Sequence, residues 1–233
     1  MFKRRLFTAT AAVSLFFLAA CGGGGGGDSG SNPPVTTFSL QSAFRAYTLA
    51  GATVNYSITG TCTGTATITD AAAVVSSFEG VSGYSVSEAI TLTFTNCTPA
   101  SSAATGTTYY DSNFTPLGSS VPGEEYAKFQ TALPPLPTSV SVGDTAQYGT
   151  LILYTDSTKT TTTGTRLLSY VVESDTSSSA IVNLISREYD TSNRLLYTQQ
   201  SRYRISAAGL LSPVSIDIQY STTSTIRLLL TRT

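Results

Sequence analysis

Residues 194–205, RLLYTQQSRYRI, decide the fold of this chain. Two sets of side chains alternate along them, one being Leu195, Tyr197, Tyr203 and Ile205 and the other Arg194, Gln200, Arg202 and Arg204. Successive side chains of a strand point to opposite faces, so this period of two predicts a strand with one buried and one polar face.

The sequence around this stretch repeats the pattern. Alternating segments are separated by polar turns such as residues 174–178 and by the hairpin loop 190–193, whose Asp and Asn favour tight turns. We therefore expect six successive antiparallel strands, at residues 148–154, 166–173, 180–189, 194–205, 214–220 and 226–232. In the first of these, Tyr148, Ile152 and Tyr154 are expected to share a face.

The first half of the mature chain adds a helix and further strands. Thr37 is expected to cap a helix to about Ala50, with Leu40, Phe44 and Tyr47 on one face and Gly51 at its end. Alternation then predicts strands at 54–58, 66–68 and 90–94, and residues 107–110 are a further candidate. Residues 123–132 fit either a helical turn or an edge strand.

Residues 133–137, LPPLP, cannot pair within a sheet and are expected to be a stiff connector. They are also the place for a possible subdomain break. We predict a mainly β fold, an antiparallel meander that forms a curved sheet or flattened barrel with one short N-terminal helix. One domain over residues 35–233 is favoured over two sandwiches.

The N-terminus has the features of an export signal. Three basic residues at positions 3–5 precede an apolar run at 6–18, which is shorter than the roughly 20 residues of a membrane span. Leu18-Ala19-Ala20-Cys21 resembles the lipobox of bacterial lipoproteins. The resemblance implies cleavage of a signal peptide at residues 1–20 and palmitate-type acylation of Cys21. In that family an Asp directly after the cysteine retains the protein in the inner membrane. Here this position is Gly22, which implies the outer membrane, with the domain on its periplasmic or surface side.

Residues 21–34 contain the acylated cysteine and a Gly-rich segment with no apolar side chain for a core, so we expect a flexible tether. The other two cysteines, Cys62 and Cys97, are expected to form a disulfide in an oxidising compartment. By the chain-entropy relation, a bridge that closes a loop of about 36 residues stabilises the folded state by roughly 4 kcal/mol.

The composition argues against several chemistries. The chain has no histidine, which is the usual general base and the commonest transition-metal ligand. With 13 basic and 14 acidic residues it has no basic surface for nucleic acid. Glu124 and Glu125 are adjacent and so point to different faces; we expect surface charge. No metal site, cofactor or catalytic residue is predicted.

Two sets of residues are candidate contact sites. A tyrosine face, expected to be either core or the lining of an apolar pocket, comprises Tyr148, Tyr154, Tyr197, Tyr203 and Tyr220. Arg202, Arg204 and Arg227 are expected on the opposite face, as an anion or partner site or as a solvated face with Asp217 as an ion-pair partner.

We expect a membrane-anchored, non-catalytic envelope lipoprotein that acts as a binding or structural module for an envelope protein or polymer. The alternative is a lipoprotein that binds lipid or another apolar ligand in a tyrosine-lined β cavity. A carboxylate-based hydrolase is the third possibility. Curved half-barrels of this kind resemble periplasmic lipoprotein carriers and lipid-binding lipoproteins, in architecture alone.

Overall fold

The computed structural model describes residues 37–221 and 226–233. The expected signal peptide, Cys21 and the tether at 21–34 lie outside the described residues. The elements are α2 (Leu40–Ala50), β1 (Ala52–Gly60), β2 (Gly64–Asp70), β3 (Val74–Phe78), β4 (Val81–Phe94), β5 (Ser101–Asp111), β6 (Pro116–Val121), β7 (Glu125–Phe129), β8 (Thr145–Tyr154), β9 (Thr162–Thr176), β10 (Ser179–Asp190), β11 (Leu195–Ser206), β12 (Leu211–Tyr220) and β13 (Ile226–Arg232).

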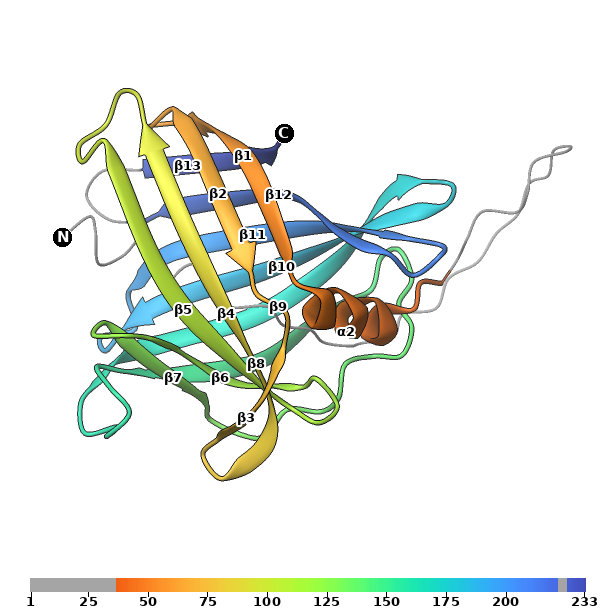
Figure 1. The fold of residues 1–233 in the computed structure, drawn as a ribbon, viewed down its shortest axis with the longest axis horizontal. Coiled ribbons are helices and arrows are strands. Elements are labelled where there is room, and N and C mark those ends of the chain that lie inside the picture. The colour runs from red at the N-terminus through yellow and green to blue at the C-terminus, as the bar shows by residue number, and fades with distance from the viewer. Residues whose placement is uncertain (1–36, 222–225) are drawn as a thin grey trace, which may run out of the picture.

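The described strands form one antiparallel barrel (Figure 1). Neighbours along the chain pair from β4 to β13, β13 returns to β1, and the pairing of β2 with β4 closes a ring of 12 strands. Strand β3 pairs with the first part of β4 and lies outside this ring. The predicted mainly β fold and flattened barrel are therefore confirmed.

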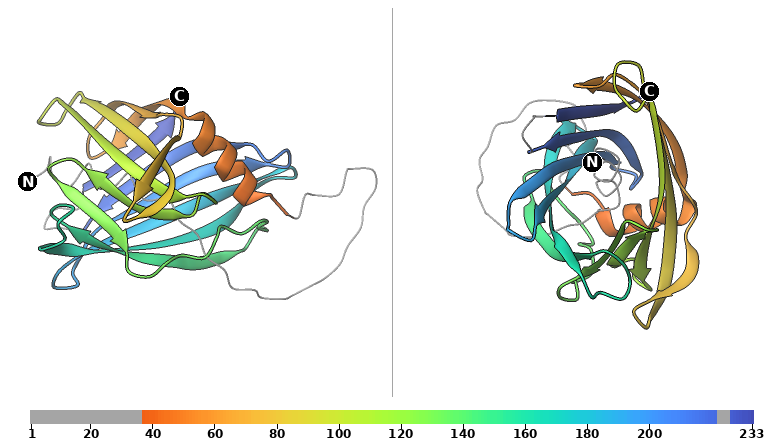
Figure 2. Two further views of the ribbon diagram at one scale, coloured as in Figure 1. Left: turned by 60° about the horizontal axis from the view of Figure 1, so that its bottom comes forward. Right: turned by 90° about the vertical axis from the view of Figure 1, so that its left-hand side faces the viewer.

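Helix α2 lies at the end of the barrel where β1 begins, and the β1–β2 turn lies at the other end (Figures 1 and 2). The predicted helix is confirmed, but it starts at Leu40 and not after Thr37. Phe38 exchanges two backbone hydrogen bonds with Val140, 2.7 and 2.9 Å long, and this bridge keeps the chain extended before the helix. Gly51, at φ +67°, ends the helix as expected and leads into β1.

Side chains alternate between the lumen and the outside, as the period of two predicts. Within β11, Tyr197 and Ile205 are buried and Arg204 is exposed. In the described part of the chain, buried side chains form two large clusters and a smaller one inside the barrel, and α2 adds Leu40, Ala43 and Phe44 to one of the large clusters. The core is thus the filled lumen of the barrel.

Bulges shift several of the expected faces. In β11 the pairing with β10 skips Leu196, so the expectation that Leu195 shares the face of Tyr197 is wrong. In β8 the pairing with β9 skips Tyr148, so Leu151 and Leu153 are buried inside while Tyr154 is not. The expectation that Tyr148, Ile152 and Tyr154 share a face is wrong, because one extra residue reverses the alternation that follows it. In β12 the pairing with β11 similarly skips Val214.

The middle of the chain is more regular than expected. Residues 107–110 belong to the long strand β5. Residues 123–132 contain β7, which pairs on both sides with β6 and β8 and so is neither helical nor an edge strand. Residues 133–137 lie in the connection from β7 to β8, two neighbours in one barrel. Among the described residues, none of the helices has the length and apolar character to cross a membrane.

Candidate functional site

The lumen contains a buried ion-pair network centred on Arg166 of β9. Its guanidinium donates two hydrogen bonds to Glu125 of β7, 2.8 and 3.1 Å long, and two to Oε2 of Glu188 of β10, 2.6 and 3.1 Å long. Tyr197 of β11 donates a hydrogen bond of 2.8 Å to the same Glu188 oxygen. One cation thus serves two carboxyl groups from strands on either side of it.

Burial in this network disfavours the charged form of each group, and the oppositely charged partner favours it. Burial lowers the pKa of the Arg166 guanidinium, but Glu125, Tyr197 and Glu188 together outweigh this effect, so the pKa of Arg166 lies well above its usual value. Burial raises the pKa of Glu125, and Arg166 offsets part of that rise. The fully buried Arg166 side chain leaves no opening toward a ligand, so the network ties β7, β9, β10 and β11 together.

Glu125 corrects a prediction. Surface charge was expected for Glu124 and Glu125, yet Glu125 is buried and paired with Arg166. The reasoning that adjacent residues point to different faces holds, but it gave no reason to place one of them inside. Pairing of β7 with β8 and of β8 with β9 brings Arg166 within reach of Glu125, 41 residues away in sequence.

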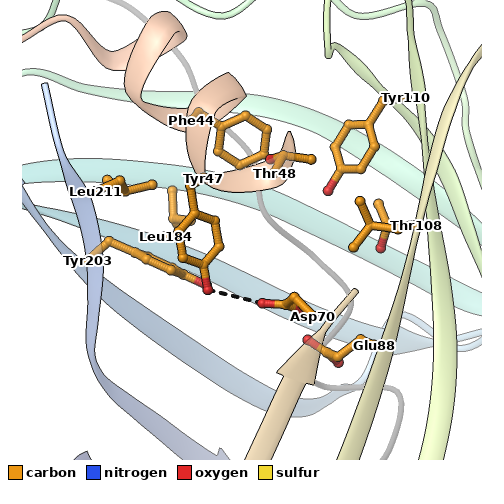
Figure 3. Close-up of a pocket in the computed structure, with 11 residues that line it drawn as sticks. Phe44, Tyr47, Thr48, Asp70, Glu88, Thr108, Tyr110, Leu184, Tyr203 and Leu211 are labelled. Atoms are coloured by element: carbon orange, nitrogen blue, oxygen red, sulfur yellow. Dashed lines mark hydrogen bonds between the residues drawn. The ribbon is translucent and has the colours of Figure 1, made fainter. Parts of the chain in front are cut away.

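A cavity of about 60 Å³ lies beneath helix α2 (Figure 3). Its polar lining includes Tyr47 from the helix, Asp70 from β2, Glu88 from β4, Thr108 and Tyr110 from β5, and Tyr203 from β11. Phe44, Val86, Leu184 and Leu211 supply its apolar lining. This space holds roughly four water molecules.

Two carboxyl groups stand beside each other in this cavity. Asp70 and Glu88 are register partners on β2 and β4. Tyr47 donates a hydrogen bond of 3.0 Å from its hydroxyl to Asp70, which connects the helix to the barrel wall (Figure 3). Burial raises the pKa of Asp70, and this hydrogen bond partly offsets the rise. Burial, followed by the charge of Asp70, raises the pKa of Tyr47.

The five predicted tyrosines do not form one surface. Tyr197 and Tyr220 lie in one core cluster, and Tyr148 and Tyr203 contribute to another. Tyr203 is the member of the set that lines the cavity beneath α2, where its ring meets that of Tyr47 edge-to-face at 6.0 Å. Tyr154 is half-buried and lies on the outer side of β8. Most of this set is packed core.

The three predicted arginines lie on the outer face, and each has an acidic partner. Arg202 pairs with Glu173 at 3.3 Å, Arg204 with Asp175 at 2.7 Å, and Arg227 with Asp217 at 2.7 Å. The expected pairing of Asp217 across the ladder is thus confirmed for Arg227. The first two pairs connect β11 with β9 across β10, the third connects β13 with β12, and the three do not converge on one site.

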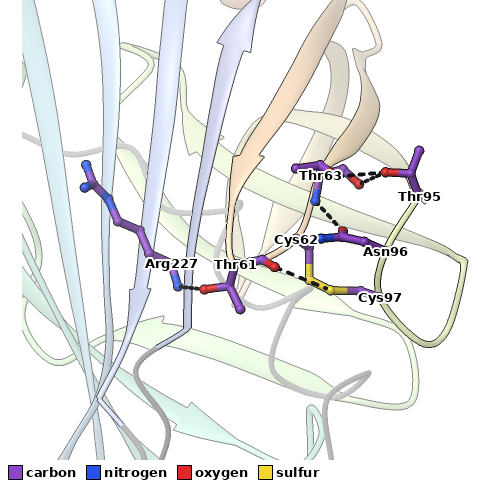
Figure 4. The surroundings of a disulfide bond; sticks show 7 residues. All are labelled: Thr61, Cys62, Thr63, Thr95, Asn96, Cys97 and Arg227. Carbon is purple, nitrogen blue, oxygen red and sulfur yellow. Dashed lines mark hydrogen bonds between the residues drawn. A yellow bond between two sulfur atoms is a disulfide. The ribbon is translucent and has the colours of Figure 1, made fainter.

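The predicted disulfide between Cys62 and Cys97 is present (Figure 4). The Cα atoms are 5.7 Å apart, within the usual range for a bridge. Cys62 lies in the β1–β2 turn and Cys97 in the β4–β5 connection, at the end of the barrel away from α2. Thr63 adds a backbone hydrogen bond of 2.7 Å to the Asn96 side chain.

Asp70 and Glu88 are the site residues that the sequence analysis missed. A signal for them existed: Asp70 has the parity of the buried Ala66 and Ile68, and Glu88 has that of Ile90 and Leu92. A carboxyl group in phase with apolar residues on a strand indicates an acid on the inner face. Within residues 37–221 and 226–233 there is no group of three or more His, Cys, Asp or Glu residues that could hold a metal ion.

No family model, curated protein or solved structure matches this chain.

Proposed function

We propose that this chain is a lipid-anchored protein of the bacterial outer membrane that acts as a non-catalytic binding module. Its ligand-binding end is the end of the barrel beneath helix α2. The observation that carries this proposal is the cavity there, where side chains from α2, β2, β4, β5 and β11 converge. The anchor is Cys21, and the partner is a ligand or polymer of the envelope.

The size of the cavity favours binding over catalysis. Two neighbouring carboxyl groups are also the catalytic groups of most glycoside hydrolases. A space of about 60 Å³, however, has no room for a sugar ring between them. The absence of histidine from the sequence removes the usual partner for other hydrolytic mechanisms.

The alternative is a module for a lipid or another apolar ligand. Its support is the apolar part of the lining, including Phe44, Leu184 and Leu211. An acyl chain exceeds the space present, so this alternative requires α2 to leave the end of the barrel. We therefore rank it second.

Anchoring is tested by labelling cells with a clickable fatty acid. Wild-type protein should carry the label and Cys21→Ser should not, because the serine hydroxyl does not take the thioether-linked lipid. Equal labelling of the two proteins would contradict the lipoprotein proposal.

Binding is tested by native mass spectrometry of the full acylated protein extracted from the envelope in mild detergent. Thr108→Phe places a ring in the cavity, so wild type should carry a small-molecule adduct that this variant lacks. The disulfide and the far-ultraviolet circular dichroism of the variant should be those of wild type. Bare protein in both samples would contradict the binding module, and a fatty-acid adduct would favour the alternative.

A further inference from the structure

We infer that the cavity beneath α2 takes a small organic cation, of the class of a short primary ammonium ion. This inference rests on the proposed function and names the ligand class of the same site. It is carried by three features together: the small, partly open cavity, the paired carboxyl groups and the aromatic side chains around them.

The paired carboxyl groups set the sign of the charge. Asp70 and Glu88 are direct cross-strand partners, so their Cβ atoms lie about 4.5–5.5 Å apart on the inner face. The described lining of the cavity contains these two acids and no lysine or arginine. Tyr47 holds one carboxyl in place with its 3.0 Å hydrogen bond. An anion would meet two acids here, whereas an ammonium ion would have two acceptors.

The aromatic rings favour an organic cation. Phe44 and Tyr110 make an edge-to-face pair at 6.0 Å, and Tyr47 and Tyr203 make a second pair at 6.0 Å. All four residues line the cavity. The face of an aromatic ring attracts a cation, most strongly where water is excluded. A purely apolar ligand would gain nothing from the carboxyl groups, whose burial is costly.

The volume sets the size of the ligand. A cavity of about 150 Å³ admits benzene, and this one is about 60 Å³. Only a few non-hydrogen atoms fit without movement of α2. An ammonium group on one or two carbons meets this limit, and a lipid or a sugar does not.

Isothermal titration calorimetry of the full acylated protein in detergent tests the inference, with methylammonium chloride as the probe. Sodium chloride at the same ionic strength and methanol are the reference titrations. Wild type should give a saturable heat with methylammonium alone. Asp70→Asn should weaken binding at least tenfold, because it removes one negative charge and keeps the shape. The matched control Asp175→Asn changes an outer-face acid and should bind as wild type does.

Wild-type heats equal to those of sodium chloride, or equal binding by wild type and Asp70→Asn, would overturn the inference. Should Asp70→Asn fail to fold, Glu88→Gln makes the same charge change from β4 and carries the test. An adduct in native mass spectrometry without methylammonium binding would leave the binding module standing and reject the ligand class. Bare protein together with no methylammonium binding would reject both.

Discussion

The inner and outer faces of the barrel wall use arginine in opposite ways. Arg166 lies inside, has no exposed surface and shares its guanidinium between Glu125 and Glu188. Arg204 lies outside with about half of its side chain exposed, and it pairs with Asp175 alone. The same residue type is a cross-link within the core in one place and a solvated partner in the other.

From this difference we expect that the burial of an ion pair, more than its N–O distance, sets its contribution to the free energy of unfolding. Both arginines have contacts shorter than 2.8 Å to a carboxylate. Water screens the outer pair, so exposed pairs contribute under about 1 kcal/mol. In the lumen, loss of one partner leaves a buried charge without its counter-ion. The predictions below test this contrast.

The largest effect is expected for Arg166→Met, which should lower the free energy of unfolding by about 3–5 kcal/mol, because two buried carboxyl groups lose their cation. Denaturant melts measure it. Replacing all three charged residues, Arg166, Glu125 and Glu188, by apolar residues of similar size should recover most of the loss. A loss below about 1 kcal/mol in the single variant would remove the distinction between the two faces.

Phe78→Ala tests whether a side chain outside the ring of strands can also contribute strongly to the free energy of unfolding. Phe78 of β3 is 5% exposed although β3 lies outside the ring, and its ring stacks on those of Tyr109 and Tyr126 at 4.6 and 5.3 Å. Gly118 permits this, because a Cβ there would lie 2.5 Å from the Phe78 ring. We expect a loss of about 3 kcal/mol.

The matched control is Val75→Ala on the same strand, where the side chain is 85% exposed. Its effect on the free energy of unfolding should stay within about 0.5 kcal/mol. Similar melts for Phe78→Ala and Val75→Ala would mean that β3 does not pack on the outer wall.

Tyr203→Ala and Arg204→Ala compare neighbours on the two faces of β11. Tyr203 is half-buried and packs on Tyr47, so its truncation should cost about 2–3 kcal/mol, below the range for a fully buried ring. Arg204→Ala should cost under about 1 kcal/mol. Denaturant melts that give equal losses would contradict the register of this strand.

The smallest effect is expected at Glu79, in the β3–β4 turn. Hydrogen bonds from Lys159, then Tyr126 and Lys128, lower the pKa of Glu79 to about 2. The unfolded value is about 4.3, so the stabilisation is complete above that pH and is lost as the pH falls toward 2. The stability difference between wild type and Glu79→Gln should therefore shrink over this window in pH-dependent melts. A constant difference would contradict the role of these contacts.

Much of the fold could be predicted from the sequence. Alternation along residues 194–205 placed Tyr203 and Arg204 on opposite faces, and the expectation of export made Cys62 and Cys97 a predicted bridge. The spacing of Leu40 and Phe44 predicted α2. The strands and the helix depend on residues that are close in sequence, and the disulfide depends on the small number of cysteines. Both can be read directly from the sequence.

Only the tertiary structure decided where that alternation breaks and which charges are enclosed. The bulge at Tyr148 reverses the faces of β8; Gly149 beside it is a residue that often marks a bulge, but it does not fix which faces follow. Pairing of β2 with β4 closes the ring and places Asp70 beside Glu88. Periodicity shows which side chains of a strand share a face. It does not show which face becomes the inside of the barrel, because that is decided only when the strands pair. Glu125 and Arg166 could therefore meet only in the folded chain.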